Sequence, residues 1–133
     1  MIPIFSASRR EDMPAFHFTE LMDKYRKYPE ESFWILWTKN PFNIISSGMD
    51  FKRVALQLTI TGIGSSKLEP YVPKSDKIWE YVNHLLCAGF NPKLINWRLD
   101  PIIPDIITPD MVRSLAKQAA DCGITRCITS FVT

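Results

Sequence analysis

Five short apolar runs divide the chain, and each of them ends in polar or charged residues. The first run is continuous and lacks the alternation of apolar and polar positions that is typical of a strand with one face in water. We therefore expect a parallel sheet covered on both faces. The predicted strands cover residues 2–8, 33–38, 54–61, 93–99 and 126–131.

Apolar residues that recur at three- and four-residue steps predict helices between these strands. The expected helices cover residues 13–27, a short segment near 44–45, residues 76–88 and residues 109–122. Asp12 or Met13 before Pro14, and Thr108 before Pro109, are typical helix starts, because a short polar side chain caps the helix and proline needs no N–H in its first turn. Strands and helices therefore alternate along the whole chain.

This alternation predicts an α/β fold of parallel βα repeats, with about five strands and four helices. An open doubly wound sheet and a segment of a (β/α)8 barrel both fit it, and both place ligands at the carboxyl ends of the strands. A full barrel needs about 250 residues, and this chain has 133. We therefore expect one domain over residues 1–133, a partial (truncated) TIM-type barrel whose last strand leaves an edge to be covered.

The composition and charge of the chain limit the classes of molecule that it is expected to bind. Sixteen basic and fourteen acidic residues give a net charge of +2, which does not indicate nucleic acid or an anionic membrane. No apolar run reaches the length of a membrane span, and the N-terminus lacks the order of a signal peptide. We expect a cytoplasmic protein.

The cysteines and histidines suggest no catalytic or metal site. Cys87, Cys122 and Cys127 are odd in number and match neither a disulfide framework nor a paired metal motif, so we interpret them as core thiols. His17 and His84 both fall in predicted helices, without a second histidine at ligand spacing. A Ser–His–Asp or Cys–His nucleophile is therefore disfavoured.

The candidate chemistry lies where the strands end. Arginine and lysine there can bind phosphate or carboxylate, and carboxylates can orient these cations or hold ribose hydroxyls. The predicted ligand-binding residues are Ser8, Arg9, Arg10, Asp12, Lys39, Asn40, Thr61, Glu69, Arg98, Asp100 and Ser130.

Each candidate also has a structural interpretation. Arg98 and Asp100 are two apart on one strand, so their side chains leave on the same side and either pair or form a cradle for an anion. Gly62 and Gly64 fit neither the dinucleotide nor the P-loop spacing. We interpret Trp97, like the tryptophan at position 37, as core rather than as a base-stacking platform.

A divalent-metal phosphoester hydrolase is an alternative, because Asp12, Glu69 and Asp100 could converge at a barrel mouth. The same strand ends also carry arginines and a lysine and no histidine, and this combination argues against a metal site.

The strand-end motifs also resemble, in order, those of the bacterial family called domain of unknown function 1848. They are Ser6-Ala7-Ser8-Arg9-Arg10 with Asp12 and Pro14-Ala15-Phe16, then Trp37-Thr38-Lys39-Asn40-Pro41, Leu68-Glu69-Pro70 with Val72-Pro73, Trp97-Arg98-Leu99-Asp100-Pro101-Ile102, and Ser130-Phe131. Longer members of that family end in a cysteine cluster like that of radical-SAM and spore-photoproduct-lyase-like proteins. The resemblance thus implies a partial barrel of radical-SAM type.

This chain departs from that family in lacking the cluster cysteines, so no iron–sulfur cluster and no radical chemistry are expected from it alone. It is either a natural miniature, of bacterial or phage origin, or part of a longer protein. The leading hypothesis is a protein that binds a small anionic ligand, a nucleotide or SAM-like molecule, at its strand ends. The alternatives are a non-catalytic module that dimerises or completes a partner through its fifth-strand edge, and the metal hydrolase.

Overall fold

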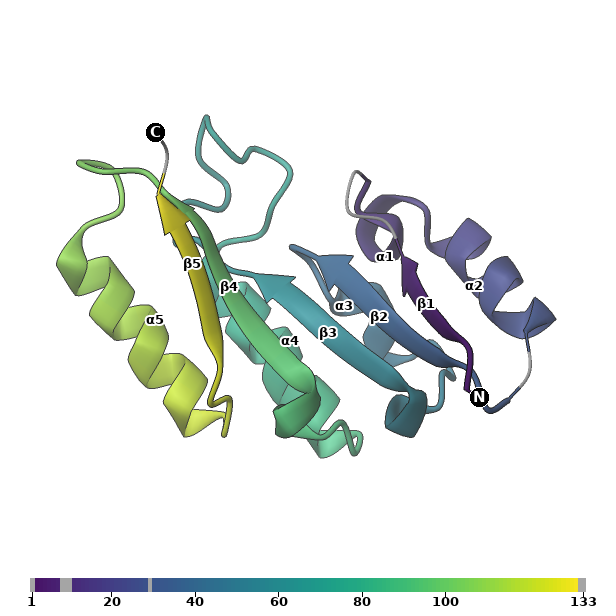
Figure 1. Cartoon of the computed structure of the whole chain (residues 1–133). Helices are drawn as coiled ribbons and strands as arrows, with labels where there is room; N and C mark the ends of the chain where they lie inside the picture. Colours follow the sequence, from purple (N-terminus) through teal and green to yellow (C-terminus); the bar gives the residue numbers. More distant parts are fainter. Residues whose placement is uncertain (1, 8–10, 29, 132–133) are drawn as a thin grey trace.

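The computed structural model describes residues 2–7, 11–28 and 30–131, in which five strands alternate with helices (Figure 1). The strands are β1 (Ile4–Ala7), β2 (Phe33–Thr38), β3 (Val54–Thr59), β4 (Ile95–Ile102) and β5 (Cys127–Phe131). The helices are α1 (Met13–Phe16), α2 (Phe18–Lys27), α3 (Phe42–Ile45), α4 (Ser75–Cys87) and α5 (Pro109–Asp121), with 3-10 turns η1 (Phe51–Arg53) and η2 (Pro92–Leu94).

All strands are parallel, and they lie in the sheet in the order β1-β2-β3-β4-β5. A doubly wound sheet would reverse its strand order at a switch point, whereas a barrel adds each strand next to the preceding one. The sequential order therefore identifies a partial barrel-like α/β fold, as predicted. In Figure 1, α3 and α4 lie behind the sheet, while α2 and α5 flank β1 and β5.

Only one face of the sheet is thoroughly buried. Side chains along β2 alternate between partly exposed and buried, and β3 and most of β4 do the same. The expectation that both faces are covered is wrong, because the helices cover one face and leave the other open. Apolar residues such as Phe33 and Ile35 on the open face are only partly exposed, so their apolar character conceals the alternation in the sequence.

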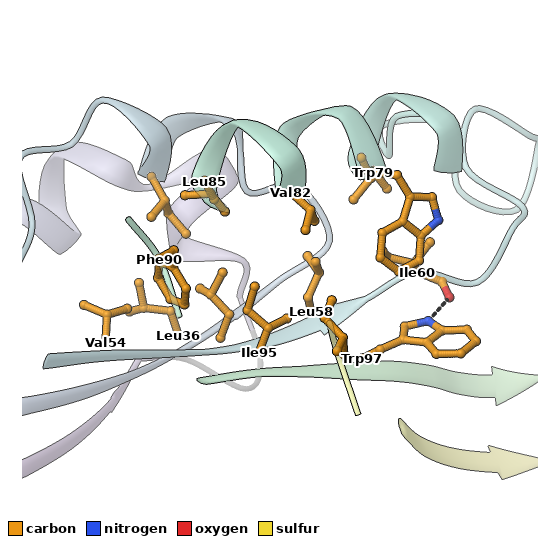
Figure 2. Close-up of a cluster of buried hydrophobic side chains, with 14 of the residues drawn as sticks. Leu36, Val54, Leu58, Ile60, Trp79, Val82, Leu85, Phe90, Ile95 and Trp97 are labelled. Atoms are coloured by element: carbon orange, nitrogen blue, oxygen red, sulfur yellow. Dashed lines mark hydrogen bonds between the residues drawn. The ribbon is translucent and has the colours of Figure 1, made fainter. Parts of the chain in front are cut away.

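The core lies between α4 and the covered face of the sheet (Figure 2). Trp79, Val82 and Leu85 of α4 point toward the sheet, where Leu58 lies fully buried. Trp97 is also buried, and its indole N–H donates to the carbonyl of residue 60 over 2.9 Å. The interpretation of Trp97 as a core residue is confirmed.

The helix starts at Asp12 and Thr108 are confirmed, because Asp12 accepts a hydrogen bond from Ala15 N and Thr108 from Met111 N. The first helix, however, is two helices rather than one. His17 leaves the helical conformation between them, and its Nε2 lies 3.7 Å from a carboxylate oxygen of Glu11. This break explains the fifth helix.

No helix in the described ranges is long and apolar enough to span a membrane.

Candidate functional site

The predicted site residues that the structure describes lie at the carboxyl ends of the strands and in the segments that follow them. Because the sheet is parallel, these ends share one edge. The predictions for Ser8, Arg9 and Arg10 lie outside the described residues.

Lys39, Thr61 and Glu69 form one polar group. The Lys39 ammonium pairs with one carboxylate oxygen of Glu69, and the Thr61 hydroxyl donates to the other. The Glu69 side chain is 9% exposed, whereas that of Lys39 is 43% exposed. Glu69 therefore fixes the loop after β3 to the end of β2, and it leaves the lysine accessible.

Asp12 and Asn40 hold the backbone around Lys39. One carboxylate oxygen of Asp12 caps α1, and the other accepts from Lys39 N over 2.8 Å, which joins the segment after β1 to the end of β2. The Asn40 side-chain oxygen accepts from Phe42 N over 3.1 Å. Both residues therefore shape the site through backbone contacts.

Arg98, Asp100 and Ser130 form the second polar group. Arg98 and Asp100 face the same side of β4 and pair with each other over 2.7 Å, and Ser130 of β5 donates to the second oxygen of Asp100. The Ser130 hydrogen bond, followed by that of Arg98, lowers the pKa of Asp100 below its ordinary value. The positive charge of Lys39 lowers the pKa of Asp100 further, which relates the two groups electrostatically.

Trp37 connects this second group to β1. The Arg98 guanidinium lies over the Trp37 ring, 4.8 Å from its centroid, and the indole N–H donates to Ser6 over 3.0 Å. Arg98 thus reaches from β4 past β3 to a ring on β2. The interpretation of Trp37 as a core residue is wrong, because its side chain is partly exposed at the open strand ends.

A cavity of about 260 Å³ opens beside these groups. Its walls come from α1, the end of β2, β3 and the loop after β3, and they include Asp12, Phe16, Trp37, Lys39, Asn40, Thr59 and Tyr71. Five predicted site residues do not line the cavity: Thr61, Glu69, Arg98, Asp100 and Ser130. The Arg98 guanidinium, however, lies over the ring of Trp37, which does line it.

Sequence reasoning missed two aromatic lining residues, Phe16 and Tyr71. Tyr71 follows Pro70 in a loop at the strand ends, and Phe16 closes a one-turn helix at the same edge. In both cases the sequence contained a usable signal. A large aromatic residue in a short connection at the carboxyl ends of the strands has little buried space available to it, so it is expected to remain near the surface.

Gly64 is needed for the conformation of the loop after β3. A Cβ atom at Gly64 would lie 2.0 Å from the carbonyl oxygen of Pro73, so only glycine permits this close approach. Gly64 also bridges to Glu69, the residue that fixes the loop to the strand ends. The loop is therefore a packed wall of the cavity.

The described residues do not fit the metal or cluster chemistry considered above. Asp12, Glu69 and Asp100 do not converge, and no group of three or more histidine, cysteine or acidic side chains in the described ranges could hold a metal ion. Cys87, Cys122 and Cys127 lie at the ends of α4 and α5 and at the start of β5, at the opposite edge of the sheet. The interpretation of these residues as core thiols is wrong, because Cys87 and Cys127 are exposed and Cys122 is partly exposed. Burial also raises the pKa of the Cys122 and Cys127 thiols, which disfavours the reactive thiolate.

Comparison with known proteins gives one finding. Searches of curated proteins and of solved structures returned no match. A family model described as a domain of unknown function, DUF1848, matches residues 24–133. Every predicted site residue from Lys39 onward falls inside that range, whereas Asp12 precedes it. Since the match covers most of its length, the chain belongs to the DUF1848 family.

Proposed function

We propose that this protein binds a small anionic ligand, such as a nucleotide or a SAM-like molecule, at the carboxyl ends of its strands. The observation that carries the proposal is a cavity of about 260 Å³ beside two cations that retain unused hydrogen-bond donors. A concave pocket with a few convergent polar groups is the usual form of a small-molecule site.

The donors can be counted. A lysine ammonium has three N–H donors and a guanidinium has five. Within the described residues, the Lys39 side chain bonds to Glu69, and the Arg98 side chain donates to Asp100. Each cation therefore keeps N–H groups that a phosphate or carboxylate can accept, while its protein partner holds it in place.

The carboxylates act on the ligand indirectly in this proposal. Glu69 and Asp100 are each bonded to a cation and a hydroxyl, so they position Lys39 and Arg98 instead of contacting ribose. Asn40 and Lys39 supply direct contacts from the cavity wall.

Isothermal titration calorimetry with AMP, S-adenosylmethionine and inorganic phosphate tests this function. We expect at least one probe to bind, and Arg98→Met to weaken its binding about tenfold or more, the effect of losing a charged hydrogen bond. Arg26→Met is the matched control, because Arg26 pairs with Asp23 on the exposed surface of α2. Absence of binding by all three probes, or equal losses in both variants, would contradict the proposal.

A second function, association with another copy of this chain through β5, is favoured by one observation. All five residues of β5 are exposed, including Ile128 and Phe131, and its outer edge has no neighbouring strand in the described sheet. An unpaired edge with apolar residues is a template for pairing. Light scattering should then give a dimer mass that Phe131→Glu reduces to that of a monomer. A monomer at every concentration would exclude this function.

A further inference from the structure

We propose that the cavity receives a planar heteroaromatic ring of the nucleobase class, which stacks on Tyr71 and Phe16 at its rim. This inference rests on the proposed function, because it specifies which part of an anionic ligand enters the cavity. The negatively charged part faces Lys39 on the cavity wall and Arg98, whose guanidinium lies over Trp37 in the same wall.

The first support is the gathering of aromatic rings around one hollow. Phe16 ends α1, Trp37 lies on β2 and Tyr71 lies in the loop after β3, yet all three line the same cavity. Sequence-tolerant binding of bases uses this kind of wall, since every base offers a π face to an aromatic side chain.

The second support is that two of these rings have no aromatic partner of their own. Phe16 is 62% exposed and Tyr71 is 82% exposed, and neither makes a ring contact with another described residue. Phe42 is a useful contrast, because this exposed phenylalanine packs on Tyr81 with ring centroids 5.1 Å apart. A ligand ring would bury apolar surface that the protein itself leaves in water.

The third support is that neutral polar groups, in addition to the Lys39 ammonium, remain free in the cavity. Both carboxylate oxygens of Asp12 accept backbone N–H groups, so that residue is already occupied. The Asn40 side-chain N–H2 and the Thr59 hydroxyl line the cavity without a partner among the described residues. Such neutral donors suit ring nitrogens and carbonyl oxygens on the edge of a base.

The size of the cavity limits the ligand. Pockets for drug-sized molecules span about 300–1,000 Å³, and this one measures about 260 Å³. It accommodates one ring system with small substituents. The predicted ligand is therefore a mononucleotide or nucleoside derivative rather than a dinucleotide.

The test compares AMP, adenosine and ribose 5-phosphate by calorimetry on the full chain. We expect AMP to bind more tightly than ribose 5-phosphate, and Tyr71→Ala and Phe16→Ala each to weaken AMP binding about tenfold. Tyr71→Phe keeps the ring and should retain the affinity. Phe42→Ala is the matched control, because it removes an exposed ring outside the cavity and should leave AMP binding unchanged.

The outcomes separate this inference from the proposed function. Equal affinity for AMP and ribose 5-phosphate, with no effect of Tyr71→Ala, would overturn the ring assignment and leave anion binding intact. Binding of inorganic phosphate without binding of AMP or adenosine would overturn it as well. Because Tyr71 and Phe16 are exposed, circular dichroism should confirm that both alanine variants fold.

Discussion

Two arginines, one near the amino ends of the strands and one near their carboxyl ends, have similar surroundings and different numbers of hydrogen-bond partners. Arg53 lies just before β3 and Arg98 lies on β4, and their side chains are 18% and 16% exposed. Each guanidinium lies over an aromatic ring, Arg53 over Tyr25 at 4.9 Å and Arg98 over Trp37 at 4.8 Å.

Their hydrogen bonds distinguish them. Arg53 donates to the Tyr25 hydroxyl and to Ser32, and it pairs with Asp50 over 3.5 Å. The Arg98 side chain donates to Asp100 and retains further N–H groups. A guanidinium whose donors go to the fold stabilises it, whereas one that retains donors beside a cavity is available to a ligand. Burial alone would not have separated the two residues.

The largest effect should come from removing Arg53. We expect Arg53→Met to lower the free energy of unfolding by about 2–4 kcal/mol, because several buried or partly buried polar groups lose a charged partner. Arg98→Met should cost at most about 1–2 kcal/mol and weaken nucleotide binding instead. Urea unfolding and calorimetry on both variants check this, and a larger loss of stability in Arg98→Met would reverse the comparison.

The next effect concerns the loop wall. Glu69→Ala should lower the free energy of unfolding by about 2–3 kcal/mol, because the buried Thr61 loses its acceptor and Lys39 loses its counter-charge. Glu80→Ala is the control, since its exposed pair with Lys77 should contribute less than about 1 kcal/mol. Similar losses in both variants would show that Glu69 does not anchor the loop.

Asp100 should make a smaller, pH-dependent contribution. Its folded pKa lies below the ordinary value, so its stabilisation is complete above an unfolded pKa of about 3.9 and is lost as the pH falls through the folded pKa. Asp100→Asn should therefore cost about 1–2 kcal/mol at pH 7, with a smaller difference from the parent protein below about pH 4. Urea unfolding across this range measures it, and a difference that grows on acidification would contradict the assignment.

The smallest effect is expected at Ser6. Ser6→Ala removes the acceptor of the Trp37 indole N–H at an exposed position, so it should cost about 0.5–1 kcal/mol. Near-ultraviolet circular dichroism and AMP titration together test whether this bond orients the ring. An unchanged spectrum with unchanged affinity would show that this bond does not orient the ring.

Much of the fold could be predicted from the chain because local signals agree with the overall topology. Apolar runs predicted all five strands, and Thr108 before Pro109 marked the start of α5. The break at His17 was not predictable, because Phe16 and Phe18 continue an apolar pattern through it. The open face was also missed, since Phe33 and Ile35 have the same apolar character whether a helix covers them or not.

The site was predictable in its position and less so in its internal contacts. Polar residues after parallel strands must share an edge, which placed Lys39, Glu69 and Arg98 together. Which carboxylate pairs with which cation depends on how the loop after β3 folds back, and no periodicity encodes that. The pair between Arg98 and Asp100 could be predicted, because the side chains of residues two apart on a strand point to the same side of the sheet.

The sequential strand order has a consequence for how the fold opens. Among the described residues, each strand pairs with its neighbours along the chain and with no other strand. Each interface therefore closes one connection of a few tens of residues, and β1 does not pair with β5 within this part of the chain. Amide hydrogen exchange should therefore be slowest in β3, which has a partner on both sides and lies centrally, and faster toward β1 and β5. Both edges would open before the centre, so the contact of Ser130 with Asp100 on the β5 side and the contact of Asp12 with the Lys39 backbone on the β1 side would each be lost before β3 opens.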